Sequence, residues 1–149
     1  MITYQTLTVK SPKFPRRTVS KWITIIAGQL GKRVGDISII FCNDVKILEI
    51  NKEYLNHNYY TDIITFDYSE NNVISGDIFI SIDTVRSNAE KYNEEYAKEL
   101  YRVIIHGVLH LCGIDDKAEG AREIMEKNED EALHILYETN MNRRSFSEA

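Results

Sequence analysis

The chain has 149 residues, of which 43% are hydrophobic, and it carries a formal net charge of −5 at pH 7. This length fits one compact domain with a single core, predicted to span residues 1–149, and leaves too little chain for a second domain. No apolar run approaches the roughly 18 residues that cross a bilayer, and the first residues lack the apolar segment of a signal peptide. These features exclude a membrane protein and predict a cytoplasmic one.

The charge is unevenly distributed along the chain. Residues 1–35 contain no acid and seven basic side chains, which are Lys10, Lys13, Arg16, Arg17, Lys21, Lys32 and Arg33. The other 114 residues carry 11 basic and 23 acidic side chains, a balance of −12. A positive face on an acidic body is suited to a phosphate backbone, and a solvated helix surface would explain the same stretch equally well.

The first half of the chain predicts two strands and two helices. Residues 2–9 alternate loosely and are rich in β-formers, so we expect a strand there, followed by a turn at the two prolines of SPKFP. Apolar residues at helical spacing predict a helix from about Arg17 to Leu30. The β-branched run 36–43 predicts a second strand, and Asn43 or Asp44 caps a short helix that reaches Tyr54.

A hairpin and two helices are predicted next. The strand-like runs 61–68 and 76–82 are separated by the polar turn residues SENN. They contain Asp62 and Asp77, which we interpret as a strand-end and a turn residue. Residues 83–112 lack proline and should form two helices that break near Asn93.

The chain is predicted to end in a further helix from about Glu119 to Tyr137 and a frayed tail over 139–149. The element order β α β α β β α α α indicates an α+β domain, with a small mixed sheet of about four strands covered by helices. Cys42 and Cys112 lie among apolar residues, so we expect reduced core thiols rather than a disulfide.

The stretch HGVLHLCGIDD, residues 106–116, contains two histidines one helical turn apart. At 100° per residue, His106 and His110 lie 40° and about 6 Å apart on one side of the helix. Between Val103 and Cys112 they are the only strongly polar side chains. Two separately hydrogen-bonded core histidines would explain them, but a metal ion supplies one partner to each ring at once, and this arrangement favours metal.

The residues after the pair offer a third ligand. Gly113 can end the helix with a positive φ and turn the chain back toward the histidines. Either Asp115 or Asp116 can then supply a carboxylate to a tetrahedral zinc with one open water position. Gly107 stands where H-E-x-x-H zinc proteases have their general base, which excludes that mechanism and indicates that something packs or binds close to the helix backbone.

These residues resemble the bacterial endoribonuclease and rRNA maturation factor family YbeY, whose signature is H-G-x-L-H-L-x-G-[YF]-D-H. The chain has the fixed H, G, L, H, L, G and D of that signature and departs at its last position, where Asp116 replaces a histidine. Two weaker family patterns, T-D-[IV]-[IL]-[ST]-F and G-D-I, match residues 61–66 and 76–78 in the family's order.

The resemblance implies a zinc-dependent, single-strand-specific endoribonuclease that acts in 16S rRNA 3′-end maturation and in ribosome quality control. It implies one Zn²⁺ per chain, bound by His106, His110 and Asp116. The implied partners are ribosomal RNA and the small ribosomal subunit or its assembly factors. The candidate RNA-binding residues are Lys10, Lys13, Arg16, Arg17 and Lys21.

Two departures from the family pattern bear on the chemistry. An anionic ligand at Asp116 lowers the net charge of the zinc centre, so bound water should be less acidic and manganese or magnesium more competitive. The family's pattern N-x-x-Y-R has Leu55 in place of its arginine, and His57 is a weak candidate to replace it. The alternatives are a non-catalytic ribosome-assembly factor with a structural zinc site and a metal-dependent hydrolase of another substrate.

Overall fold

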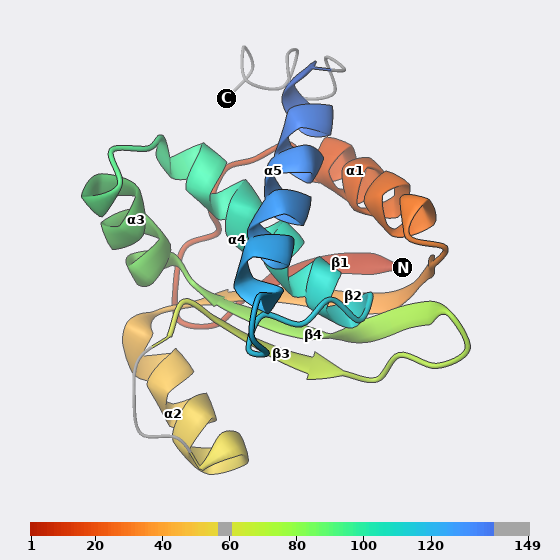
Figure 1. The fold of residues 1–149 in the computed structure, drawn as a ribbon. Helices are drawn as coiled ribbons and strands as arrows, with labels where there is room; N and C mark the ends of the chain where they lie inside the picture. The colour runs from red at the N-terminus through yellow and green to blue at the C-terminus, as the bar shows by residue number, and fades with distance from the viewer. Residues whose placement is uncertain (57–60, 139–149) are drawn as a thin grey trace.

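Strands and helices follow the predicted order in the computed structural model, which describes residues 1–56 and 61–138 (Figure 1). The strands are β1 (Ile2–Thr6), β2 (Arg33–Cys42), β3 (Ile63–Asp67) and β4 (Val73–Ser81). The helices are α1 (Arg16–Gln29), α2 (Asp44–Leu55), α3 (Ile82–Lys91), α4 (Tyr96–Leu111) and α5 (Ala121–Glu138). The tail that we expected to be frayed, 139–149, lies outside the described residues.

The four strands form one mixed sheet in the order β1-β2-β4-β3, which confirms the predicted fold class. β1 and β4 each pair in parallel with β2, whereas β3 and β4 form the predicted antiparallel hairpin. β4 begins at Val73, three residues before the predicted start, because Val73 and Ile74 pair with the beginning of β2. Asp77 therefore lies within a strand, and its interpretation as a turn residue is wrong.

Helices cover the two faces of the sheet unequally. Ile74, Ile78 and Ile80 alternate along β4 toward the main core, on the side where α1 and α4 pack (Figure 1). The indole Nε1 of Trp22 in α1 donates to the carbonyl of Ala132 in α5 at 2.8 Å, which ties α5 to the same side. On the other face α2 packs over β3 and β4 near Phe79.

α4 lies unusually close to the sheet at Gly107. A Cβ at this position would be 2.9 Å from both Ile63 Cδ1 and Ile78 Cγ2, which is closer than real Cβ contacts. The expectation of close packing at Gly107 is confirmed, and the close neighbour is the sheet. Because His106 and His110 flank this contact, it fixes the height of both histidines above β3.

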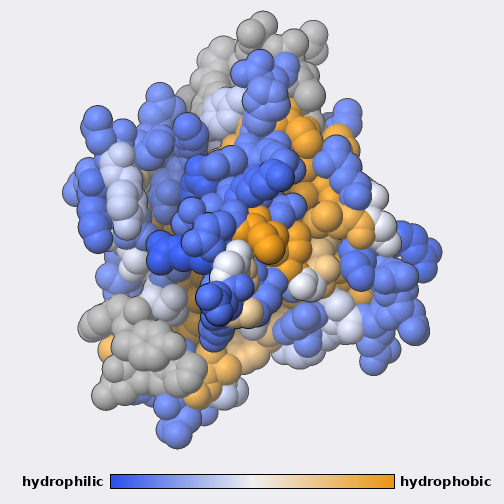
Figure 2. All heavy atoms as spheres, viewed as in Figure 1, coloured by the Kyte–Doolittle hydropathy of each residue, from blue (hydrophilic) through white to orange (hydrophobic). Residues whose placement is uncertain are grey.

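The face seen in Figure 2 is largely hydrophilic over α3 and α5. No helix in the described part of the chain is both long and apolar enough to cross a bilayer. Both cysteines are free thiols, Cys42 buried as expected and Cys112 only half-buried at the end of α4.

Candidate metal centre

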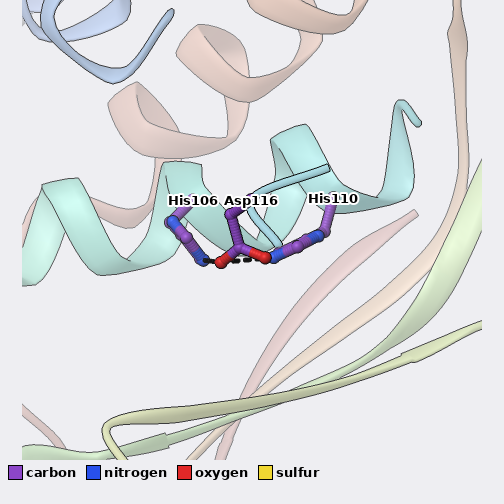
Figure 3. A group of neighbouring side chains, drawn as sticks. All are labelled: His106, His110 and Asp116. Carbon is purple, nitrogen blue, oxygen red and sulfur yellow. Dashed lines mark ion pairs between the residues drawn. The ribbon is translucent and has the colours of Figure 1, made fainter. Parts of the chain in front are cut away.

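His106 and His110 project from the last turns of α4 into the same space (Figure 3). Both side chains are half-buried, and their ring centroids lie 4.7 Å apart with an angle of 78° between the planes. The Nε2 atom of each ring lies 3.3 Å from the same oxygen, Oδ2 of Asp116. Three donor atoms therefore surround one point at the end of the helix.

The end of α4 brings Asp116 to the histidines. Gly113 adopts a φ of +95°, as the sequence predicted, and its N–H donates to the carbonyl of His110 at 2.9 Å. The N–H of Ile114 donates to the carbonyl of Leu109 at 3.0 Å. This pair of bonds is the Schellman arrangement that ends a helix and reverses the chain.

Asp115 and Asp116 make different contacts. Its Oδ1 accepts from the backbone N–H groups of Asp116 and Lys117, and its Oδ2 accepts from that of Ala118. These bonds lower the pKa of Asp115. Of the two candidate carboxylates, the structure therefore directs Asp115 to its own loop and places Asp116 with the histidines.

The distances from Asp116 to the two histidines fit a zinc-sized ion. Donors bound to one tetrahedral zinc at about 2.0–2.1 Å lie about 3.3 Å apart, which is the separation between Asp116 Oδ2 and each imidazole Nε2. The second oxygen of Asp116, Oδ1, is buried without a hydrogen-bond partner. His106, His110 and Asp116 are the group of three potential ligands found among the described residues. Converging lone pairs with an unpaired carboxylate oxygen call for a cation or a proton, and the spacing of the donors suits a metal ion.

The three residues line a pocket of about 660 Å³ between β3, α4, α5 and the end of α2. Six carboxylates line it, namely Asp62, Asp67, Glu99, Asp116, Glu126 and Glu129. Three basic side chains also line it, namely Arg102, Lys117 and Arg122. The lining is acidic overall, so the pocket suits a divalent cation better than an unaccompanied phosphate.

Burial and mutual repulsion shift the pKa values of groups in the pocket. Burial works to lower the pKa of His106, but the hydrogen bond and charge of Glu129, with Asp116 and Asp62, outweigh burial and raise it. Burial also raises the pKa of Asp62. Burial, aided by the charge of Asp62, raises the pKa of Glu99 to about 7. Protons and cations therefore compete for this pocket near neutral pH.

The other predicted site residues lie in different places. Leu55 lines the same pocket as the three potential ligands. His57 lies outside the described residues. None of the five candidate RNA-binding residues, Lys10, Lys13, Arg16, Arg17 and Lys21, lines the pocket. They precede or belong to α1, which packs over β2 rather than β3, and their contact with RNA stays a prediction.

Sequence reasoning missed four pocket residues for which a signal existed. Glu99 and Arg102 continue the line of His106 and His110 along one side of α4, at spacings of three or four residues. Glu129 interrupts the apolar face of α5. Asp62, interpreted only as a strand-end residue, directly precedes β3 and also lines the pocket.

The sequence matches one protein family over most of its length. Residues 2–137 match the model of the family described as Endoribonuclease YbeY. A curated relative named Endoribonuclease YbeY from Parabacteroides distasonis is 59% identical over 137 residues, covering 92% of this chain and 96% of the relative. Another of that name, from Phocaeicola vulgatus, is 60% identical over 136 residues, covering 91% and 99%.

A solved structure shares the fold. The solution structure of TM1509 from Thermotoga maritima is similar with a TM-score of 0.62 and 25% sequence identity. The similarity covers 94% of this chain and 93% of that protein. The two proteins thus share the overall fold.

Proposed function

The chain belongs to the endoribonuclease YbeY family, and from this premise we propose that it is a metal-dependent endoribonuclease that cuts single-stranded RNA. The observation that carries the proposal is the convergence of His106, His110 and Asp116 on one point in an open pocket. We propose further that the enzyme acts in the cytoplasm, in 16S rRNA 3′-end maturation and ribosome quality control, as the family resemblance implies. Its partners there would be the small ribosomal subunit or its assembly factors.

His106, His110 and Asp116 would hold one Zn²⁺ per chain through Nε2, Nε2 and a carboxylate oxygen. A bound divalent ion supplies Lewis acidity, which acidifies water and stabilises charge that develops on a phosphate. The carboxylate of Asp116 reduces the net positive charge that the site presents, compared with a third neutral imidazole.

Other pocket residues would bind the substrate and hold protons. Lys117 follows Asp116 directly and lines the pocket, so its ammonium group can bind a phosphate that approaches the metal group. Asp62 lines the pocket with His106, and burial raises the pKa of its carboxyl, which suits a role in proton transfer. The pocket, about 660 Å³ in volume and lined on one side by β3, would accommodate part of an extended strand of RNA.

One observation favours a second candidate function. Leu55 lines the pocket where the family pattern has an arginine, and a leucine cannot stabilise charge on a phosphoryl oxygen. Arg102, in the same pocket, is already bound to Glu129 and Asp130. A non-catalytic ribosome-assembly factor with a structural zinc site would have no need of a free arginine.

The two functions separate in a cleavage assay on protein free of contaminating nucleases. We expect the wild-type protein to cut single-stranded RNA, to spare duplex RNA and to contain about one metal ion per chain. His110→Ala should lose both metal and cleavage while keeping its fold. His134→Ala changes an exposed histidine of α5 outside this pocket and should keep both properties. Cleavage that survives in His110→Ala would refute the proposed metal-dependent endoribonuclease. Bound metal without cleavage in the wild-type protein would favour the assembly factor.

A further inference from the structure

A glutamate is buried in the apolar face of α5. Glu129 is only 5% exposed. It lies on the same face of α5 as four residues that are buried in the main core, Met125, Ala132, Leu133 and Leu136. A carboxylate without partners in such a place would be strongly destabilising, because an unpaired ion would be buried. Its partners therefore indicate why the chain keeps it there.

Both oxygens of Glu129 are bound, each to a residue of α4. Oε2 lies 2.6 Å from Nδ1 of His106. Oε1 accepts from Nη1 of Arg102 at 3.0 Å, and Nη2 of the same guanidinium donates to Asp130 at 2.9 Å. Arg102 thus fixes the carboxylate from one side while the carboxylate fixes the imidazole on the other.

The contact at Nδ1 determines which nitrogen of His106 is available. A carboxylate accepts a hydrogen bond and cannot donate one, so Nδ1 must carry the proton. In the neutral ring Nε2 then keeps its lone pair, and Nε2 is the atom that lies 3.3 Å from Asp116 Oδ2. The ring is held by Glu129 in the one neutral tautomer that can bind a metal at this point.

The second histidine has no such support. Within the described part of the chain, no carboxylate lies within hydrogen-bonding distance of Nδ1 of His110, whose ion-pair contact is through Nε2. The side chain of His110 is 29% exposed, compared with 21% for His106. One ligand of the group is thus oriented by a buried carboxylate and the other is not.

We propose that Glu129, held by Arg102, is a positioning residue of the metal centre. It selects the Nδ1–H tautomer of His106, fixes the plane of the ring and increases the electron-donating strength of Nε2. Carboxylates that bind the second nitrogen of a metal-bound histidine act in this way. This inference rests on the proposed function, because it takes the histidine group to be a metal centre. It also means that the packing of α5 against α4 sets the metal affinity.

Zinc affinity, measured by competition with a chromogenic chelator, tests the inference without an activity assay. We expect Glu129→Gln, which keeps the size of the side chain, to weaken zinc binding by about 10-fold to 100-fold. Glu129→Met fills the same volume without any hydrogen bond and should weaken it at least as much. Asp130→Asn removes only the outer, exposed partner of Arg102 and should change the affinity by less than about threefold.

A spectroscopic readout separates positioning from general destabilisation. In metal-free protein, at a pH where the ring is neutral, long-range ¹H–¹⁵N correlation should show His106 as the Nδ1–H tautomer, and Glu129→Met should lose this preference. A wild-type ring in the Nε2–H form, or a folded Glu129→Gln protein with wild-type zinc affinity, overturns the inference. Wild-type protein that binds no zinc at all would instead overturn the metal centre on which it rests.

Discussion

Two carboxylate clusters in this protein differ in what surrounds them. At the N-termini of α2 and α3, Oδ1 of Asp44 accepts from the hydroxyls of Ser81 and Thr84 at 2.5 and 2.6 Å. Asp83 Oδ2 accepts from the backbone N–H of Asp44 at 3.1 Å. In this helix junction, each of these acceptor oxygens meets a donor from the chain itself.

In the group formed by His106, His110 and Asp116, acceptor oxygens lack such donors. Oδ2 of Asp116 faces the Nε2 atoms of both histidines, and Nε2 of His106 is an acceptor in the neutral tautomer that Glu129 favours. Oδ1 of Asp116 is buried without a hydrogen-bond partner. At His106 the chain places an acceptor against an acceptor, so the missing donor must come from outside as a cation or a proton. A binding site in this protein is therefore marked by hydrogen-bond acceptors without a donor, rather than by acidic residues as such.

Removing one carboxylate from each cluster should give the largest difference between them, in zinc affinity and in stability. We expect Asp116→Ala to weaken zinc binding by at least about 100-fold, because it removes a ligand rather than a neighbour of one. Asp44→Ala should leave zinc affinity unchanged and lower the free energy of unfolding by about 1–3 kcal/mol, since two hydroxyls lose their acceptor. Chelator competition and urea unfolding measure the two effects. Equal losses of zinc affinity in both variants would show that the clusters do not differ in kind.

The pH dependence of stability tests the uncompensated pocket carboxyls. Burial raises the pKa of Glu99 from its ordinary value of 4.5 to about 7 in the folded state, so the folded protein holds this proton more tightly than the unfolded chain does. The stabilisation is complete below about pH 4.5 and is lost as pH rises to about 7. Glu99→Gln stays neutral and should therefore exceed the wild type by on the order of 2 kcal/mol at pH 8.

Urea unfolding of metal-free protein between pH 4 and 8 measures this gap. Glu123→Gln, at an exposed position of α5, is the matched control and should follow the wild-type curve. Parallel curves for Glu99→Gln and the wild type would contradict a raised pKa at Glu99.

The smallest expected effect concerns the choice of metal. Asp116→His should restore a third imidazole and raise the ratio of zinc to manganese affinity by about 10-fold, because a nitrogen donor favours zinc over the harder ion. Asp67→Asn, at another carboxylate of the same pocket, should leave the ratio unchanged. A ratio that stays constant in Asp116→His would indicate that Asp116 does not contact the metal.

The sequence predicted what depends on near neighbours in the chain. Helical and alternating patterns located the elements, and the metal group was visible because its residues lie within 106–116 and a single glycine turns the chain back. The start of β4 was missed because Val73 and Ile74 follow the polar turn residues directly and gain their strand conformation by pairing with β2.

Local sequence patterns do not predict contacts between residues that are far apart in the chain. Glu129 lies 23 positions from His106, and only the packing of α5 on α4 brings the two together. A lone glutamate on an apolar helix face signals a buried partner, but the pattern does not name it. The identity of that partner depends on how α4 and α5 are rotated against each other, which a local pattern does not determine.

Zinc K-edge X-ray absorption of the zinc-loaded protein tests the central claim most directly. We expect two imidazole nitrogens and oxygen donors at about 2.0–2.1 Å, with the imidazole signal reduced or the zinc lost altogether in His110→Ala. A sulfur shell near about 2.3 Å, or a spectrum unchanged in His110→Ala, would contradict a metal centre formed by His106, His110 and Asp116.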